Sequence, residues 1–158
     1  MLECLIAPPD YALCIDLEAT CSPDCQLNEM EIIEIGACVV EVDTAQVISQ
    51  FNALVRPAVS QTITPFCTEL TGIKQSQIDT ADNFPVVCAQ LSWWLKNNPY
   101  ITIWLSWGQF DQDIWLADCR KTNTPNPLNH LEHINAKKLF SKVQVFRKRV
   151  GLKKAVEL

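Results

Sequence analysis

The chain has 158 residues, enough for a single domain that buries roughly 70% of its unfolded surface. Its composition, with 48% hydrophobic and 20% charged residues and a net charge of −5, is that of a globular protein. No apolar stretch approaches the roughly 20 residues that span a bilayer, and the acidic N-terminus is unlike a signal peptide, so we expect a soluble cytoplasmic protein.

Strand patterns dominate the first part of the chain. Residues 11–17 are mostly apolar and predict a buried central strand. Residues 31–43 and 46–56 predict two further strands, and the connection between them has the length of a hairpin turn. We therefore expect an antiparallel meander of three strands.

Helix and strand patterns alternate after this meander. The expected elements are a short helix ended by Gly72, a helical turn within 73–81, a helix within 83–98, a buried strand at 100–107, a helix at about 110–121, a short strand near 133–136, and helices at 136–141 and from about 148 onward. This order predicts an α/β protein with a mixed sheet and helices packed on its faces.

Eight cysteines are scattered along the chain, several of them in apolar runs. Buried free thiols explain this distribution better than a disulfide framework. The one close pair, Cys21 and Cys25 in "CSPDC", lacks the second pair that a structural zinc site needs, so a surface loop is the preferred interpretation.

Charge is distributed unevenly along the chain. Residues 1–119 carry 16 of the 18 acids and three bases, whereas residues 120–158 carry ten bases against Glu132 and Glu157. The acidic part could concentrate metal cations and the basic part could bind phosphates. The charge pattern alone favours the simpler interpretation, a solvated basic face on the last helices.

Two acids, Asp16 and Glu18, lie at the end of the first strand, in "LCIDLEAT". Residues i and i+2 of a strand point to the same face, so both carboxylates project together. Two like charges are unfavourable there unless a cation or a shared proton offsets them, and hard Mg²⁺ or Mn²⁺ prefers carboxylate oxygens. The alternative is that both acids are exposed at a frayed strand end.

A second acidic pair follows another buried strand, in "SWGQFDQD". Asp111 and Asp113 could simply cap the helix that begins near Phe110. However, two strands that each deliver acids at their exits predict a site of three converging carboxylates. Such a site could hold one or two metal ions, in the latter case about 4 Å apart, for phosphodiester cleavage.

Five segments in the same order resemble the DEDDh 3′–5′ exonucleases: "IDLEAT", "EIIEIGA", "FCTELTGI", "SWGQFDQD" and "GLKKAVEL". The branch in question includes the histone mRNA 3′ exonuclease and its bacterial relatives, and the resemblance runs over about residues 11–158. It implies a ribonuclease H-like fold, with a three-strand antiparallel meander plus two parallel strands. It also implies an enzyme that binds the 3′ end of single-stranded RNA or DNA and releases 5′-nucleoside monophosphates.

The same resemblance assigns roles to individual residues. The catalytic acids, which would hold two Mg²⁺ or Mn²⁺ ions, are Asp16, Glu18 and Asp111. The residues matching positions that line the terminal nucleotide pocket are Thr20, Phe66 and Phe110. Bases stack on aromatic rings in such pockets, although core packing is an equal alternative for Phe66. Asp113 matches no metal position, and Trp107 is the tryptophan that could reach the site.

The family's third motif, a histidine general base five residues before a fourth aspartate, has no counterpart in this chain. The last aspartate is Asp118 and the last histidine is His133, which we expect to be structural, while His130 should be exposed. The general base is therefore missing, which typically costs about 10²–10⁴-fold in rate.

These features predict a single exonuclease domain, 1–158, that is truncated at its C-terminus and has weak or no activity. A missing helix would uncover apolar sheet surface and invite a homodimer. A fragment, a natural truncation and a tail supplied by another subunit all remain open. The alternative function is a catalytically dead module that binds nucleic acid or a protein, although the intact acids argue against it.

Overall fold

The computed structural model describes residues 9–144 and 149–157, which contain a six-stranded sheet in the order β4-β3-β2-β1-β5-β6. Three long antiparallel strands form the predicted meander: β1 (Tyr11–Ala19), β2 (Ile32–Glu41) and β3 (Gln46–Arg56). Beyond β1, the sheet continues with two parallel strands, β5 (Ile103–Ser106) and β6 (Glu132–Asn135). The predicted mixed α/β sheet of ribonuclease H-like type is confirmed.

Six α-helices surround this sheet in the described residues: α1 (Pro65–Thr71), α2 (Gln75–Asp79), α3 (Phe84–Lys96), α4 (Phe110–Lys121), α5 (Ala136–Val143) and α6 (Leu152–Val156). Three of them begin with a polar side chain that accepts a hydrogen bond from a backbone N–H of the first turn, namely Thr64 for α1, Asn83 for α3 and Asn135 for α5. Gly72, at φ 76°, ends α1 in the left-handed conformation that favours glycine.

The structure differs from the expected elements at short segments. A two-residue strand, β4 (Asp82–Asn83), pairs in parallel with β3, and a 3-10 turn, η1 (Leu27–Glu29), precedes β2. Neither is long enough to produce a periodic pattern. β5 is shorter than the apolar run 100–107, and the expected helix start near 148 lies outside the described residues.

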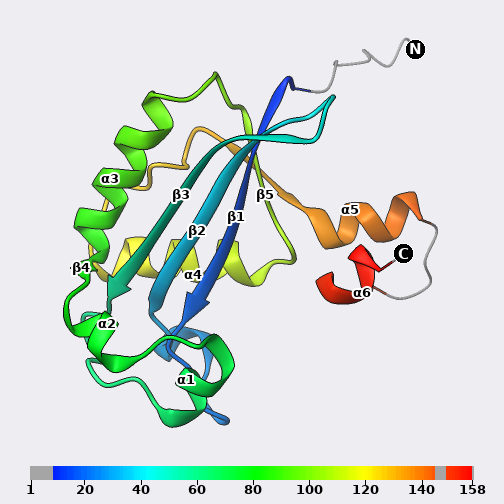
Figure 1. Ribbon diagram of the computed structural model, residues 1–158. Coiled ribbons are helices and arrows are strands. Elements are labelled where there is room, and N and C mark those ends of the chain that lie inside the picture. Colours follow the sequence, from blue (N-terminus) through cyan, green and yellow to red (C-terminus); the bar gives the residue numbers. More distant parts are fainter. Residues whose placement is uncertain (1–8, 145–148, 158) are drawn as a thin grey trace.

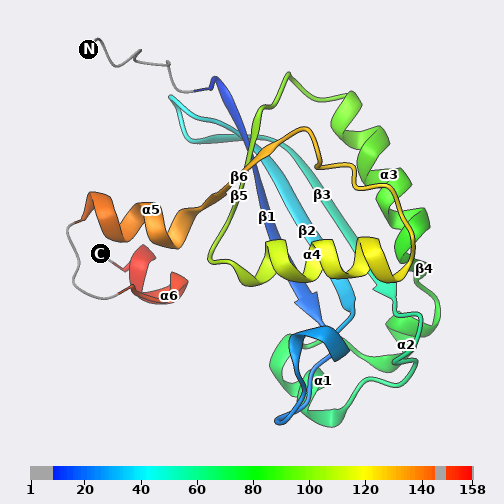
Figure 2. The same cartoon turned by 180° about the vertical axis from the view of Figure 1, so that it is seen from behind.

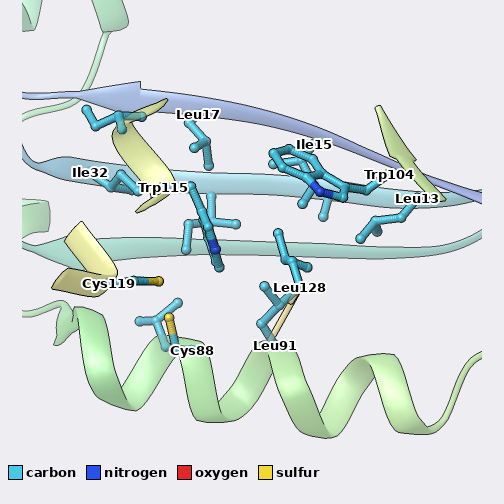
Figure 3. Packing of buried hydrophobic residues seen from close by; sticks show 14 of the residues in the cluster. Leu13, Ile15, Leu17, Ile32, Cys88, Leu91, Trp104, Trp115, Cys119 and Leu128 are labelled. Atoms are coloured by element: carbon cyan, nitrogen blue, oxygen red, sulfur yellow. The ribbon is translucent and has the colours of Figure 1, made fainter. Parts of the chain in front are cut away.

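One face of the sheet packs against α3 and α4. In Figure 1 α4 crosses behind the strands, and in Figure 2, seen from the opposite side, it lies in front of them; α3 runs beside the strands in both views. Alternate residues of β1 are buried on this side and meet Trp115 of α4 and Leu91 of α3, as Figure 3 shows for Leu13, Ile15 and Leu17. Successive side chains of a strand point to opposite faces of the sheet. Those of Cys14, Asp16 and Glu18 therefore point away from this core.

The opposite face of the meander carries a groove. In Figure 1 no drawn helix lies over the front of β1, β2 and β3. The groove is lined by Asp16, Gly36 and Asn52 from the three strands, with Trp107 and Leu152 at its edge. Asp16 therefore lies on the open side of the sheet.

Among the described helices, none combines the length and apolar character needed to cross a membrane.

Candidate active site

The two acids of β1 lie on the open face of the sheet. Asp16 is exposed and Glu18 half-buried, whereas their neighbours Ile15 and Leu17 are buried in the core. Gly36 stands opposite Asp16 in the β1–β2 ladder, so no side chain of β2 covers that carboxylate. The predicted same-face arrangement of the two acids is thus present.

Asp111 reaches the same place from the first turn of α4. Its side chain is only 7% exposed, and its Oδ1 accepts a hydrogen bond of 3.2 Å from the backbone N–H of Leu17. This bond ties the start of α4 to the residue between the two acids of β1. The described structure thereby places Asp111 beside the segment of β1 that carries Asp16 and Glu18.

Burial and neighbouring carboxylates oppose the ionisation of Asp16, Glu18 and Asp111. Burial raises the pKa of Asp111 most, and the charge of Asp16 raises it further, although the Leu17 N–H partly offsets both. The pKa of Glu18 is raised by burial and then by Asp16, Glu34 and Asp111. Burial, followed by the charge of Glu34, raises the pKa of Asp16. A cation placed among these groups would relieve the repulsion.

The donor set has the chemistry that a hard divalent ion requires. Carboxylates from β1 and α4 lie near one another, and burial followed by the charge of neighbouring carboxylates raises the pKa of each. In the described ranges, however, no three His, Cys, Asp or Glu side chains are close enough together to enclose a metal ion. The residues fit Mg²⁺ or Mn²⁺, but their side chains must turn toward one another to bind it.

The predicted nucleotide-contacting residues lie in different surroundings. Phe66 on α1 is 42% exposed and Phe110 at the start of α4 is 40% exposed, so both rings are open to a ligand and Phe66 is not a core residue. Thr20 is buried, and its Oγ1 accepts a hydrogen bond of 2.9 Å from Glu31 N. Its side chain holds the start of β2, and its role in substrate binding stays a prediction.

Neither histidine contacts the carboxylates, although Ser106, the partner of His133, lies close enough to Asp111 to lower the pKa of that carboxyl. His133 Nε2 lies 2.9 Å from Ser106 Oγ, and the imidazole packs against Trp104 with ring centroids 4.3 Å apart. Burial lowers the pKa of His133. His130 is exposed and lines a separate pocket beside Lys96 and Tyr100. The described residues therefore offer no imidazole base next to Asp16, Glu18 and Asp111.

Comparison with known proteins identifies the family to which this chain belongs. A family model described as exonuclease, of the RNase T type, matches residues 13–154. The 3′-5′ exoribonuclease 1 of Mus musculus is 33% identical over 137 residues, which cover 83% of this chain and 40% of that protein. The chain belongs to the DEDDh 3′–5′ exonuclease family.

Other members of this exonuclease family agree in sequence and fold. The 3′-5′ exonuclease crn-4 of Caenorhabditis elegans is 32% identical, over 85% of this chain and 47% of that protein. A solved nuclease domain of the DEDDh family member 3′hExo, bound to rAMP, superposes with a TM-score of 0.78 at 28% identity, covering 92% of this chain and 74% of that one. An exonuclease I structure, at 13% identity and a TM-score of 0.69, shares the fold. The chain spans less than half the length of the two curated relatives named here.

Sequence patterns missed one acid beside the candidate site. Glu34 of β2 stands directly opposite Glu18 in the ladder, and its charge raises the pKa of both Asp16 and Glu18. The sequence argument selected acids at or just after the end of a strand, whereas Glu34 lies near the start of one, in "EIIEIGA". The register of β1 against β2 could have found it, since Glu18 and Glu34 pair once the meander is aligned.

Proposed function

We propose that this chain removes nucleotides from the 3′ end of single-stranded RNA and releases 5′-nucleoside monophosphates. The observation that carries the proposal is the hydrogen bond from Leu17 N–H to Asp111, which places the start of α4 beside Asp16 and Glu18 of β1. At this place the charge of Asp16 raises the pKa of both Glu18 and Asp111. The names of the exoribonuclease relatives and the rAMP bound to a related nuclease domain support RNA as the substrate.

The three carboxylates would hold two Mg²⁺ or Mn²⁺ ions, which supply activation of the attacking water and stabilisation of the leaving 3′ oxygen. The chain's own contribution is to position these groups. Leu17 N–H orients Asp111, and the exposed rings of Phe66 and Phe110 offer stacking surfaces for the terminal bases.

A polar groove beside the start of α4 suits the phosphates of the strand. It is lined by Gln109 and Gln112 of the α4 region and by Lys138 and Lys142 of α5. Both lysines are exposed, so they could contact a polyanion without prior rearrangement. In our proposal this groove binds the nucleotides upstream of the 3′ end.

We expect turnover by this chain to be slow. Neither histidine has a hydrogen bond to the three carboxylates in the described residues, because His133 contacts Ser106 and His130 lines another pocket. A missing general base typically lowers a rate by about 10²–10⁴-fold. A module that binds nucleic acid without cleaving it is therefore the second candidate function.

The deciding experiment follows shortening of a 5′-labelled single-stranded RNA with Mn²⁺. The chain is compared with Asp16→Asn and with Asp43→Asn, a control that removes an exposed acid from the β2–β3 turn. We expect slow 3′-end trimming that Asp16→Asn abolishes and Asp43→Asn retains. Equal activity in all three proteins would contradict the assigned site. If none of them cleaves but the RNA still binds, the binding module is the better description.

A further inference from the structure

Two cysteines that are far apart in the sequence are in contact near the carboxylate site. Cys21 lies in the loop after β1, and Cys67 lies in α1. Cys21 packs against the small apolar cluster that contains Cys67, and the Cys67 thiol is close enough to raise the pKa of Cys21. Neither is engaged in a disulfide. They are therefore a preformed pair of thiols that joins two separate elements.

Hydrogen bonds of the surrounding residues hold the two segments together. Thr64 Oγ1 donates to the carbonyl oxygen of Cys21 at 2.6 Å and accepts from the backbone N–H of Cys67 at 3.0 Å. The Cys67 thiol also donates to the carbonyl oxygen of Ala19 at 3.5 Å. Because Thr64 bridges both backbones, the approach of the two cysteines does not depend on the Cys21 side chain.

We propose that Cys21 and Cys67 are a redox-active dithiol that is oxidised reversibly to an intramolecular disulfide. The two thiols differ in access, because Cys21 is partly exposed whereas Cys67 is 0% exposed. An external oxidant can therefore reach Cys21 first, and Cys67 is placed to react with the product. The bond to be formed, about 2.05 Å long, replaces an existing thiol–thiol contact.

With a small disulfide such as glutathione disulfide as oxidant, the step balances through two exchanges. Cys21, after losing its proton to solvent, attacks one sulfur of glutathione disulfide, which forms a mixed disulfide and releases one glutathione thiolate. Cys67, likewise deprotonated, then attacks the Cys21 sulfur and releases the second glutathione. The two released thiolates take up the two protons, so two protein thiols are oxidised while glutathione disulfide is reduced.

The disulfide would fasten α1 to the end of β1. α1 carries the exposed Phe66 ring, and the end of β1 carries Glu18. Because the cross-link closes a long loop of the unfolded chain, it should raise the Tm by roughly 10 °C. This expectation concerns stability and covalent structure, so it stands whether or not the chain cleaves RNA.

The test uses the full reduced chain, incubated with glutathione disulfide and then digested and mapped without reductant. Burial and the neighbouring Cys67 thiol raise the pKa of Cys21 to about 12, which keeps its thiolate scarce, so the incubation is long and is made at alkaline pH. We expect peptides joined through Cys21 and Cys67, and a rise in Tm that a reductant reverses.

Two variants complete the test. Cys21→Ala should abolish the rise in Tm on oxidation, whereas Cys25→Ala, which removes the nearest other cysteine of the loop, should retain it. The proposal is overturned by linkage through Cys25, by linkage of Cys14 to Cys38 across β1 and β2 instead, or by a glutathione adduct on Cys21 that never resolves. Peptide mapping of the unmodified chain decides the question even if a variant fails to fold.

Discussion

Glu34 and Glu18 occupy directly opposite positions in the β1–β2 ladder, so two carboxylates share one place on the open sheet face. Like charges in such positions destabilise a sheet. The Glu34 side chain accepts a hydrogen bond of 2.8 Å from Asn52 Nδ2, which the oxygen of a glutamine could also accept. We predict that Glu34→Gln raises the free energy of unfolding in metal-free buffer by about 0.2–1 kcal/mol, measured by urea denaturation.

The matched control is Glu69→Gln, at an exposed position of α1, which should change the free energy of unfolding much less. High salt screens exposed charges, so the gain from Glu34→Gln should shrink as the ionic strength rises. A loss of stability in Glu34→Gln at low salt would show that repulsion between the two glutamates is not the dominant effect.

Asp111 and Asp113 are neighbours on α4 with different surroundings. Asp111 is buried against Leu17, whereas the Asp113 side chain accepts from Gln109 Nε2 at 3.2 Å on the exposed side of the helix. Asp111→Asn keeps the acceptor for Leu17 N–H and removes the charge. We therefore predict that it weakens Mn²⁺ binding by at least about tenfold in calorimetric titration. Asp113→Asn is the control, and an equal loss there would contradict the choice of Asp111 as a ligand.

Among the elements, α4 is joined to β2 through one buried carboxylate. Asp118 is 3% exposed, its Oδ2 accepts from Ile32 N at 2.7 Å, and its Oδ1 lies 3.3 Å from Lys121 Nζ. Burial raises the pKa of Asp118, although the Ile32 N–H and Lys121 act in the opposite direction. A carboxyl whose pKa is higher in the folded chain stabilises the fold below its unfolded value of about 3.9. That stabilisation is lost as the pH rises through the folded pKa.

Asp118→Asn tests this pH dependence, because asparagine keeps an acceptor for Ile32 N–H and does not titrate. The free energy of unfolding of the unmodified chain should fall, relative to that of the variant, as the pH rises above the ordinary aspartate range. Chemical denaturation of both proteins at several pH values measures the difference. A difference that stays constant or grows with pH would mean that Lys121 and Ile32 outweigh burial.

The sequence predicted the long elements well and the short ones poorly. The strands β1 to β3 and the helices α3 and α4 carry many apolar residues in a clear period, so their existence follows from burial. β4 pairs over only two residues, and its position depends on the end of β3 rather than on its own side chains. Similarly, Glu34 lies beside the site because the pairing register of β1 and β2 places it opposite Glu18. That register depends on both strands and cannot be deduced from either one alone.

At the scale of the whole molecule, the site depends on an asymmetric sheet. α3 and α4 lie on one face of the meander and bury it (Figure 2). The carboxylates of β1 alternate with its buried residues and therefore point to the other face. The order of the strands places β1 at the centre, between β2 and β5, so that α4, entered directly from β5, begins beside the end of β1. Sequence patterns predicted the convergence of Asp16 and Asp111 from this topology. They could not predict how closely the side chains approach, because that depends on packing.

Metal binding should therefore stabilise the whole fold. Measuring it distinguishes a site that binds the catalytic ions from one that does not. A ligand that binds only the folded chain adds about 2.7 kcal/mol at a concentration of about 100 times its Kd. We predict that millimolar Mn²⁺ raises the Tm of the unmodified chain and of Asp43→Asn, but not that of Asp16→Asn, in thermal unfolding followed by circular dichroism. Relief of the repulsion among Asp16, Glu18 and Asp111 is the physical reason. If the unmodified chain shows no shift, its carboxylates do not close on an ion, and the module that binds without cleaving becomes the preferred function.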